Sequence, residues 1–187
     1  MGQDLGDTHI MRKYAYAIRC LVGEDPFWTE MRWVRVECAI IDIDAAHQDG
    51  QTEQVVAFAN AITDHLEEWE GQLGGAPLDE IRQFRSRCHN VASALYRGRY
   101  YDLAIPLFRK AITYCTMAHE PYLWLAACLW ATTKQREKVL PFLVQAAHRD
   151  TDGGEPWENF RALPEFDDVR DDPEFAQAAR VVTKVVL

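Results

Sequence analysis

Apolar residues recur every three or four positions along most of the chain, which is the period of an amphipathic α-helix. In the stretch that begins at Thr52, for example, Val55, Ala59, Ile62 and Leu66 fall on one side of a helix. We therefore predict an all-α protein. The helices that the pattern predicts span 8–22, 25–47, 52–71, 78–97, 101–118, 121–132, 135–149 and 157–163, with a last helix from Pro173.

Glycine and proline mark where these helices begin and end. Asp25-Pro26 supplies a capping acid followed by proline at the first helical position, and Gly50 ends the helix that starts there. Thr52 is expected to cap the next helix. Residues 72–77 contain two glycines and a proline and predict a tight bend. The later connections are short, so consecutive helices are expected to pack antiparallel.

One motif occurs twice at an offset of 35 residues, within the helices predicted at 101–118 and 135–149. Pro106 aligns with Pro141, and three apolar pairs align with them. These pairs are Ala104 with Val139, Phe108 with Leu143, and Ala111 with Ala146. A weaker echo lies further upstream, where residues 58–63 match residues 108–113 at four of six positions. A repeat of this length is typical of helical hairpins that stack on one another.

These residues resemble the tetratricopeptide repeat family. The resemblance implies antiparallel helical hairpins stacked as a short solenoid, and a scaffold that binds another protein or peptide. The chain departs from the family pattern in the Gly98–Tyr101 turn, which has one residue more than usual, and at Val139, where a small residue is usual. Pro106 and Pro141 are also unusual, and we expect them in or near the first turn of the second helix of each hairpin, where a missing amide hydrogen has little effect.

The repeat divides the chain into three parts of one continuous domain. Residues 1–71 are expected to form an N-terminal helical portion with one degenerate repeat, and residues 78–149 two hairpins. Residues 150–187 are expected to form an acidic loop and a C-terminal capping helix. A stacked array needs such an atypical end unit, because an uncapped hairpin would expose its apolar face.

By the same resemblance, a concave groove is lined by the first helix of each hairpin. The groove residues are Arg82, Arg85, His89, Ser93 and Tyr96 in one hairpin, and Trp124 and Cys128 in the next. Arg82, Arg85 and His89 share one helix face and fit an acidic partner peptide; the alternatives are a solvated arginine face or internal pairing with the acidic tail. Trp124 is either an anchor for the partner or a core residue. The family's terminal-carboxylate clamp needs Lys and Asn at set groove positions, and this chain has neither there.

Charge is unevenly distributed along the chain and gives a second hypothesis. The formal net charge is −9, yet residues 78–110 carry seven bases and three acids, while residues 150–175 carry ten acids and two bases. The acidic balance argues against nucleic-acid binding. The alternative function is that of an acidic neutralising protein, of the immunity or anti-toxin type, that covers a basic enzyme. Its contact surface is Asp167, Asp168, Asp171 and Asp172.

Known catalytic motifs do not occur in the sequence, so we expect no enzyme, no catalytic residues and no cofactor. Asp42, Asp44, His47 and Asp49 do not converge on one helix face, and we expect no metal site. The five cysteines form no CxxC pair, which favours buried thiols in a reducing cytoplasm. No run of about eighteen apolar residues predicts a membrane span. A cytoplasmic protein whose partner is another protein or peptide, without membrane contact, is therefore expected.

Overall fold

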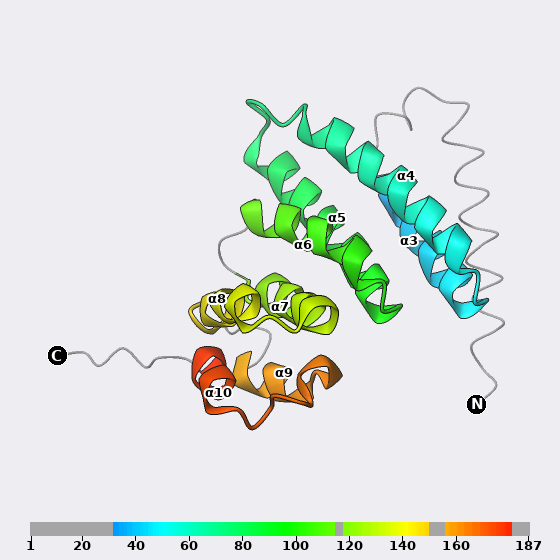
Figure 1. Cartoon of the computed structure of the whole chain (residues 1–187). Coiled ribbons are helices and arrows are strands. Elements are labelled where there is room, and N and C mark those ends of the chain that lie inside the picture. The colour runs from blue at the N-terminus through cyan, green and yellow to red at the C-terminus, as the bar shows by residue number, and fades with distance from the viewer. Residues whose placement is uncertain (1–31, 115–117, 150–155, 181–187) are drawn as a thin grey trace, which may run out of the picture.

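The computed structural model describes residues 32–114, 118–149 and 156–180, and within these ranges it contains helices and no β-strand (Figure 1). The prediction of an all-α protein is confirmed. The helix predicted at 8–22 and the start of the one predicted at 25–47 lie outside the described residues. The elements are α3 (Arg32–Gln48), α4 (Thr52–Glu70), α5 (Leu78–Arg97), α6 (Tyr101–Thr113), α7 (Glu120–Thr133), α8 (Arg136–Ala147), α9 (Pro156–Ala162), the 3-10 helix η1 (Pro164–Phe166) and α10 (Pro173–Ala179).

Consecutive helices pack in pairs, and each pair packs on the next. α3 contacts α4, α5 contacts α6, and α7 contacts α8, while α3 with α5 and α6 with α7 join successive pairs. Figure 1 shows these pairs following one another from α3 and α4 to α9 and α10, which cover the far side of α7 and α8. A single hydrophobic cluster runs through all of them, with Phe84, Phe108, Leu123 and Phe175 fully buried. Burial of these side chains is the main force that holds the pairs together.

The 35-residue offset of the sequence motif reappears as a pattern of burial in α6 and α8. The three aligned apolar pairs, from Ala104 and Val139 to Ala111 and Ala146, are all buried. Pro106 and Pro141 are each the sixth residue of their helix, and both are exposed. The second turn, rather than the first, therefore holds both prolines, where the missing N–H leaves the carbonyl four residues earlier without its helical donor.

Two turn residues have a left-handed backbone, and they are also 35 residues apart. Arg99 follows α5 with φ 63°, and Lys134 follows α7 with φ 53°. Residues with a Cβ rarely adopt this conformation. Gly98 stands before Arg99, where an added Cβ would lie 2.7 Å from the ring of Tyr100. The two hairpin turns thus share a local conformation as well as a spacing.

Some helix ends differ from the sequence prediction. Thr52 is the first residue of α4, and the N-cap is Gln51, which makes no side-chain capping bond. α6 ends at Thr113 instead of continuing to residue 118. At α10 the side chain of Asp172 accepts hydrogen bonds from the backbone N–H groups of Glu174 and Phe175, which fixes the start at Pro173 as predicted.

Every helix in the described part of the chain is too short or too polar to cross a lipid bilayer.

Candidate functional site

Trp124 of α7 lies between two rings of α5. Its indole is parallel to the imidazole of His89, with centroids 5.1 Å apart, and to the ring of Tyr96, with centroids 5.7 Å apart. His89 and Tyr96 are two helical turns apart, about 10.5 Å along the axis, so the indole lies between them. The ring of Phe108 from α6 meets Trp124 edge-on, at 6.0 Å. We call these four residues the aromatic stack.

The aromatic stack joins α5 to α7. His89 and Trp124 are 35 residues apart in the sequence, and both side chains are half-buried. Parallel rings at these distances are offset rather than face to face, which is the favourable geometry for aromatic pairs. Part of the Trp124 side chain remains exposed, because the residue is only half-buried.

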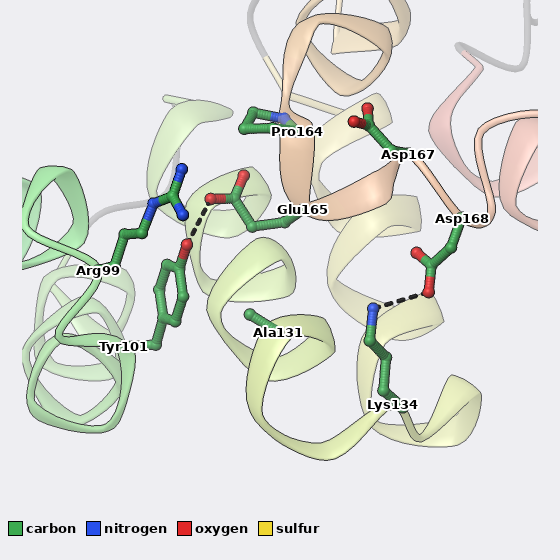
Figure 2. A pocket seen from close by; sticks show the side chains of 8 residues that line it. All are labelled: Arg99, Tyr101, Ala131, Lys134, Pro164, Glu165, Asp167 and Asp168. Carbon is green, nitrogen blue, oxygen red and sulfur yellow. Dashed lines mark hydrogen bonds and ion pairs between the residues drawn. The ribbon is translucent and has the colours of Figure 1, made fainter.

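Glu165 of η1 connects the C-terminal part of the chain to this stack. The hydroxyl of Tyr96 donates to Glu165 Oε2 at 2.7 Å. The hydroxyl of Tyr101 donates to Glu165 Oε1 at 2.8 Å, and Figure 2 shows this second bond. Burial, together with the hydrogen bond to Glu165, raises the pKa of Tyr101 to about 12 and raises the pKa of Tyr96 as well. Both hydroxyls therefore keep their protons at neutral pH. We call Tyr96 and Tyr101 the tyrosine pair.

A hollow of about 380 Å³ opens beside the tyrosine pair, and we call it the edge pocket. Figure 2 shows Arg99 and Tyr101 on one side of it and the segment from Pro164 to Asp168 on the other. Among the described residues the side chain of Arg99 makes neither a hydrogen bond nor an ion pair. The pocket thus places this guanidinium near the carboxylate of Glu165, which is already bound to two tyrosines, and near the carboxylates of Asp167 and Asp168.

Asp168 anchors the far side of the edge pocket. Its carboxylate accepts hydrogen bonds from Trp130 Nε1 and from Lys134 Nζ, each at 2.7 Å. Partial burial acts to raise the pKa of Asp168, but these two hydrogen bonds outweigh it and hold the pKa below its ordinary value. Asp168 is therefore ionised at neutral pH and fastens its segment to the end of α7.

A second, smaller cavity of about 110 Å³ lies at the other end of the stack, and we call it the inner cavity. Arg85, Ser86, His89 and Glu120 contribute its polar lining. His89 Nδ1 is buried there without a hydrogen-bond partner among the described residues. Burial lowers the pKa of His89, with Glu120 opposing the effect and Arg85 reinforcing it, so the ring is neutral at pH 7.

Four of the predicted groove residues come together in this arrangement. Arg85 and His89 line the inner cavity, and Tyr96 and Trp124 belong to the aromatic stack. Arg82 lies apart, exposed on the outer side of α5, where its guanidinium pairs with Asp79 at 3.2 Å.

Two other predicted groove residues point into the core. Ser93 is only 7% exposed, and its hydroxyl donates to the carbonyl oxygen of His89 at 2.7 Å. Cys128 has no exposed surface, and burial raises the pKa of its thiol. Both side chains are therefore buried in the folded chain, and a partner could not contact them there.

Several acids in the described part of the acidic tail pair with basic residues of the same chain. Asp172 accepts from Arg136 at 2.6 Å, and the same guanidinium reaches Glu174 at 3.1 Å. Asp167 pairs with Arg170 three residues along. Of the four acids in the alternative contact surface, Asp167, Asp168 and Asp172 thus have partners within the chain, and Asp171 is exposed.

Sequence reasoning did not single out Glu165, Tyr101, Arg99 or Lys134 as site residues. The offset of 35 between Arg99 and Lys134 is visible in the sequence and marks the two turns as equivalent. The role of Glu165 carries no sequence signal, because its tyrosine partners lie 69 and 64 residues earlier in the chain.

Comparisons with protein-family models, with curated proteins and with solved structures found no match to this chain. Within the ranges that the structure describes, no three His, Cys, Asp or Glu side chains gather in a way that could hold a metal ion. The site is therefore interpreted from its own geometry.

Proposed function

We propose that the chain is an adaptor-type scaffold, built like a tetratricopeptide-repeat solenoid, that binds a segment of another protein along the face formed by α5 and α7. The repeat is supported by the equivalent positions of Pro106 and Pro141 and by the left-handed turns at Arg99 and Lys134. Each feature recurs at the same offset of 35 residues.

One observation carries the proposal: a segment of the chain itself, residues 164–168 with η1 in it, already lies against α7 and bonds to Tyr96 of α5. The segment is held by specific polar contacts, with Glu165 between the tyrosine hydroxyls and Asp168 between Trp130 and Lys134. Hydrogen bonds to a carboxylate are stronger than neutral ones and depend on the position of the acceptor. The surface is thus suited to select one acidic segment by its side chains.

The partner segment would run along α5, between the inner cavity and the edge pocket. Trp124 lies midway, and tryptophan, tyrosine and arginine contribute most to binding energy at protein interfaces. The rings of the stack hold one another in place, so little side-chain freedom remains to be lost on binding. Arg85 at one end and Arg99 at the other supply positive charge for the same segment.

Contacts within the chain favour this proposal over the acidic neutralising protein. Asp168 and Asp172 bind Lys134 and Arg136, so much of the negative charge of the tail stabilises the C-terminal cap. The alternative proposal keeps one clear requirement: binding to a basic partner must weaken steeply with salt and with Asp171→Asn.

The experiment that tests the scaffold is selection of peptides from a displayed random library on the full chain. The affinity of each selected peptide is then measured for the wild type, for Trp124→Ala and for the matched control Trp33→Ala, which changes a tryptophan that is 39% exposed on α3. We expect Trp124→Ala to lower the affinity for the selected peptides by about tenfold or more, and Trp33→Ala to lower it by less than about twofold. Equal affinities for the two variants, both shown to be folded by circular dichroism, would overturn the proposal.

A further inference from the structure

The edge pocket combines the bound carboxylate of Glu165 with Arg99, whose side chain makes no hydrogen bond or ion pair in the described part of the chain. We propose that this pocket is a binding site for an acidic side chain of the partner segment, and that Glu165 occupies it as a built-in competitor. This inference rests on the proposed scaffold function and specifies the chemistry of the partner.

Tyr101 in the pocket and Tyr96 beside it are arranged to hold a carboxylate. Tyr96 and Tyr101 approach the two oxygens of Glu165 from different helices, at 2.7 and 2.8 Å. Their raised pKa values keep both hydroxyls protonated, so they donate and do not repel an anion. Arg99 stands in the same wall, and its planar guanidinium matches the geometry of a carboxylate. A second anion fits these donors if Glu165 leaves them.

Glu165 can leave without unfolding its segment, because other side chains fix η1. The neighbouring Phe166 is fully buried, with its ring centroid 4.7 Å from that of Phe160 and 6.4 Å from that of Phe175. Asp168 holds the segment at the other end through Lys134. Glu165 itself is only half-buried. Rotation about its own side-chain bonds between staggered conformers is enough to free the tyrosine hydroxyls.

Because Glu165 competes for the tyrosine hydroxyls, a ligand must bind tightly enough to displace it. A tethered group acts at an effective concentration that reaches the millimolar range for short connections. A lone carboxylate in solution therefore displaces Glu165 poorly. A segment that also contacts Trp124 gains the additional affinity that is needed to displace Glu165 from the tyrosine hydroxyls. The partner is thus an acidic segment that also carries a side chain for the aromatic stack.

The test uses full-length protein and an acetylated hexaglutamate peptide as the probe, with binding followed by changes in amide NMR shifts at low ionic strength. Four proteins are compared: wild type, Glu165→Gln, Glu165→Gln with Arg99→Ala, and Glu165→Gln with Arg109→Ala. Arg109 is the matched control, because it is exposed on α6, the helix of Tyr101, and lines neither cavity.

We expect Glu165→Gln to bind the probe at least about fivefold more tightly than the wild type, because the competing charge is gone. Adding Arg99→Ala should reverse most of this gain, and adding Arg109→Ala should change it by less than about twofold. Equal affinity of Glu165→Gln and wild type, or equal effects of the two arginine changes, would overturn the inference. If Glu165→Gln does not fold, Tyr101→Phe in the wild-type chain replaces it, and unchanged binding of the probe would then count against the site.

Failure of this inference is distinguishable from failure of the scaffold proposal. Hexaglutamate carries no side chain for the aromatic stack, so its affinity should not depend on Trp124. If the affinity for the probe changes with Glu165→Gln and Arg99→Ala, while the affinity for library peptides is unchanged by Trp124→Ala, only the scaffold groove is rejected. If Trp124→Ala weakens the library peptides, while the changes at Glu165 and Arg99 leave the affinity for the probe unchanged, only the carboxylate site is rejected.

Discussion

The indole of Trp124 stacks on the imidazole of His89, the residue 35 positions before it, with ring centroids 5.1 Å apart and planes inclined by 12°. This contact joins α5 and α7, each of which is the first helix of a packed pair. The same side chain also meets Tyr96 and Phe108, so one residue links α5, α6 and α7.

Replacing Trp124 by alanine should therefore lower the free energy of unfolding by about 2–4 kcal/mol, because three ring contacts are lost and a cavity remains. Trp124→Phe should lower it by less than half as much. Urea denaturation followed by circular dichroism measures both. If Trp124→Ala lowers the free energy of unfolding by less than the control variant Trp33→Ala does, the stack contributes little to stability.

Replacing Pro106 or Pro141 by alanine should stabilise the protein by roughly 1–2 kcal/mol at each site. Alanine restores an N–H that can bond to the carbonyl of Asp102 or Glu137, and both proline rings are exposed, so little packing is lost. Thermal denaturation of the single and double variants gives the values. If one substitution stabilised the protein and the other destabilised it, the structural equivalence of α6 and α8 would be contradicted.

Cys88 and Cys128 should resist alkylation by iodoacetamide in the folded protein and react when it unfolds. Both thiols are fully buried, and burial raises the pKa of Cys88 to about 12 and raises that of Cys128. The reactive thiolate is therefore scarce at neutral pH. Mass spectrometry of labelled peptides, with and without urea, measures the difference, and rapid labelling of either residue in the absence of urea would refute the expectation.

Stability should fall as the solution is acidified below the ordinary His pKa of 6.5, and His89 should account for part of the loss. Burial lowers the pKa of His89 in the folded chain, so the unfolded chain takes up its proton first as the pH decreases. The loss grows until the folded ring is protonated as well.

His89→Phe keeps a ring beside Trp124 and cannot titrate, so its midpoint of urea denaturation should change less between about pH 7 and about pH 5.5 than that of the wild type. Some pH dependence should remain, because burial also lowers the pKa of His65. An identical pH dependence in variant and wild type would show that His89 does not couple protonation to folding.

Helices are predicted most accurately from the sequence where a proline or glycine marks their ends. α5 was predicted with the bounds that the structure shows, because Pro77 precedes it and Gly98 follows it. The end of α6 was missed by several residues, since residues 114–118 have no glycine or proline to mark it. The register of Pro106 with Pro141 was found because it depends only on spacing.

Part of the candidate site could be predicted through the resemblance to a helical-repeat family. That resemblance places His89 and Tyr96 on the first helix of one hairpin and Trp124 on the first helix of the next. The bonds of Glu165 depend on how the last helices fold back on α7, which no local pattern encodes. Lys134 in a left-handed turn is equally hidden, because that conformation ordinarily favours glycine or asparagine.

The two left-handed turns place backbone strain and positive charge on the same residues, Arg99 and Lys134. Arg99 and Lys134 each bear a steric penalty of about 1 kcal/mol that glycine would relieve. A version of the protein optimised for heat resistance would carry glycine at both turns. It would lose the positive rim of the edge pocket in the same step.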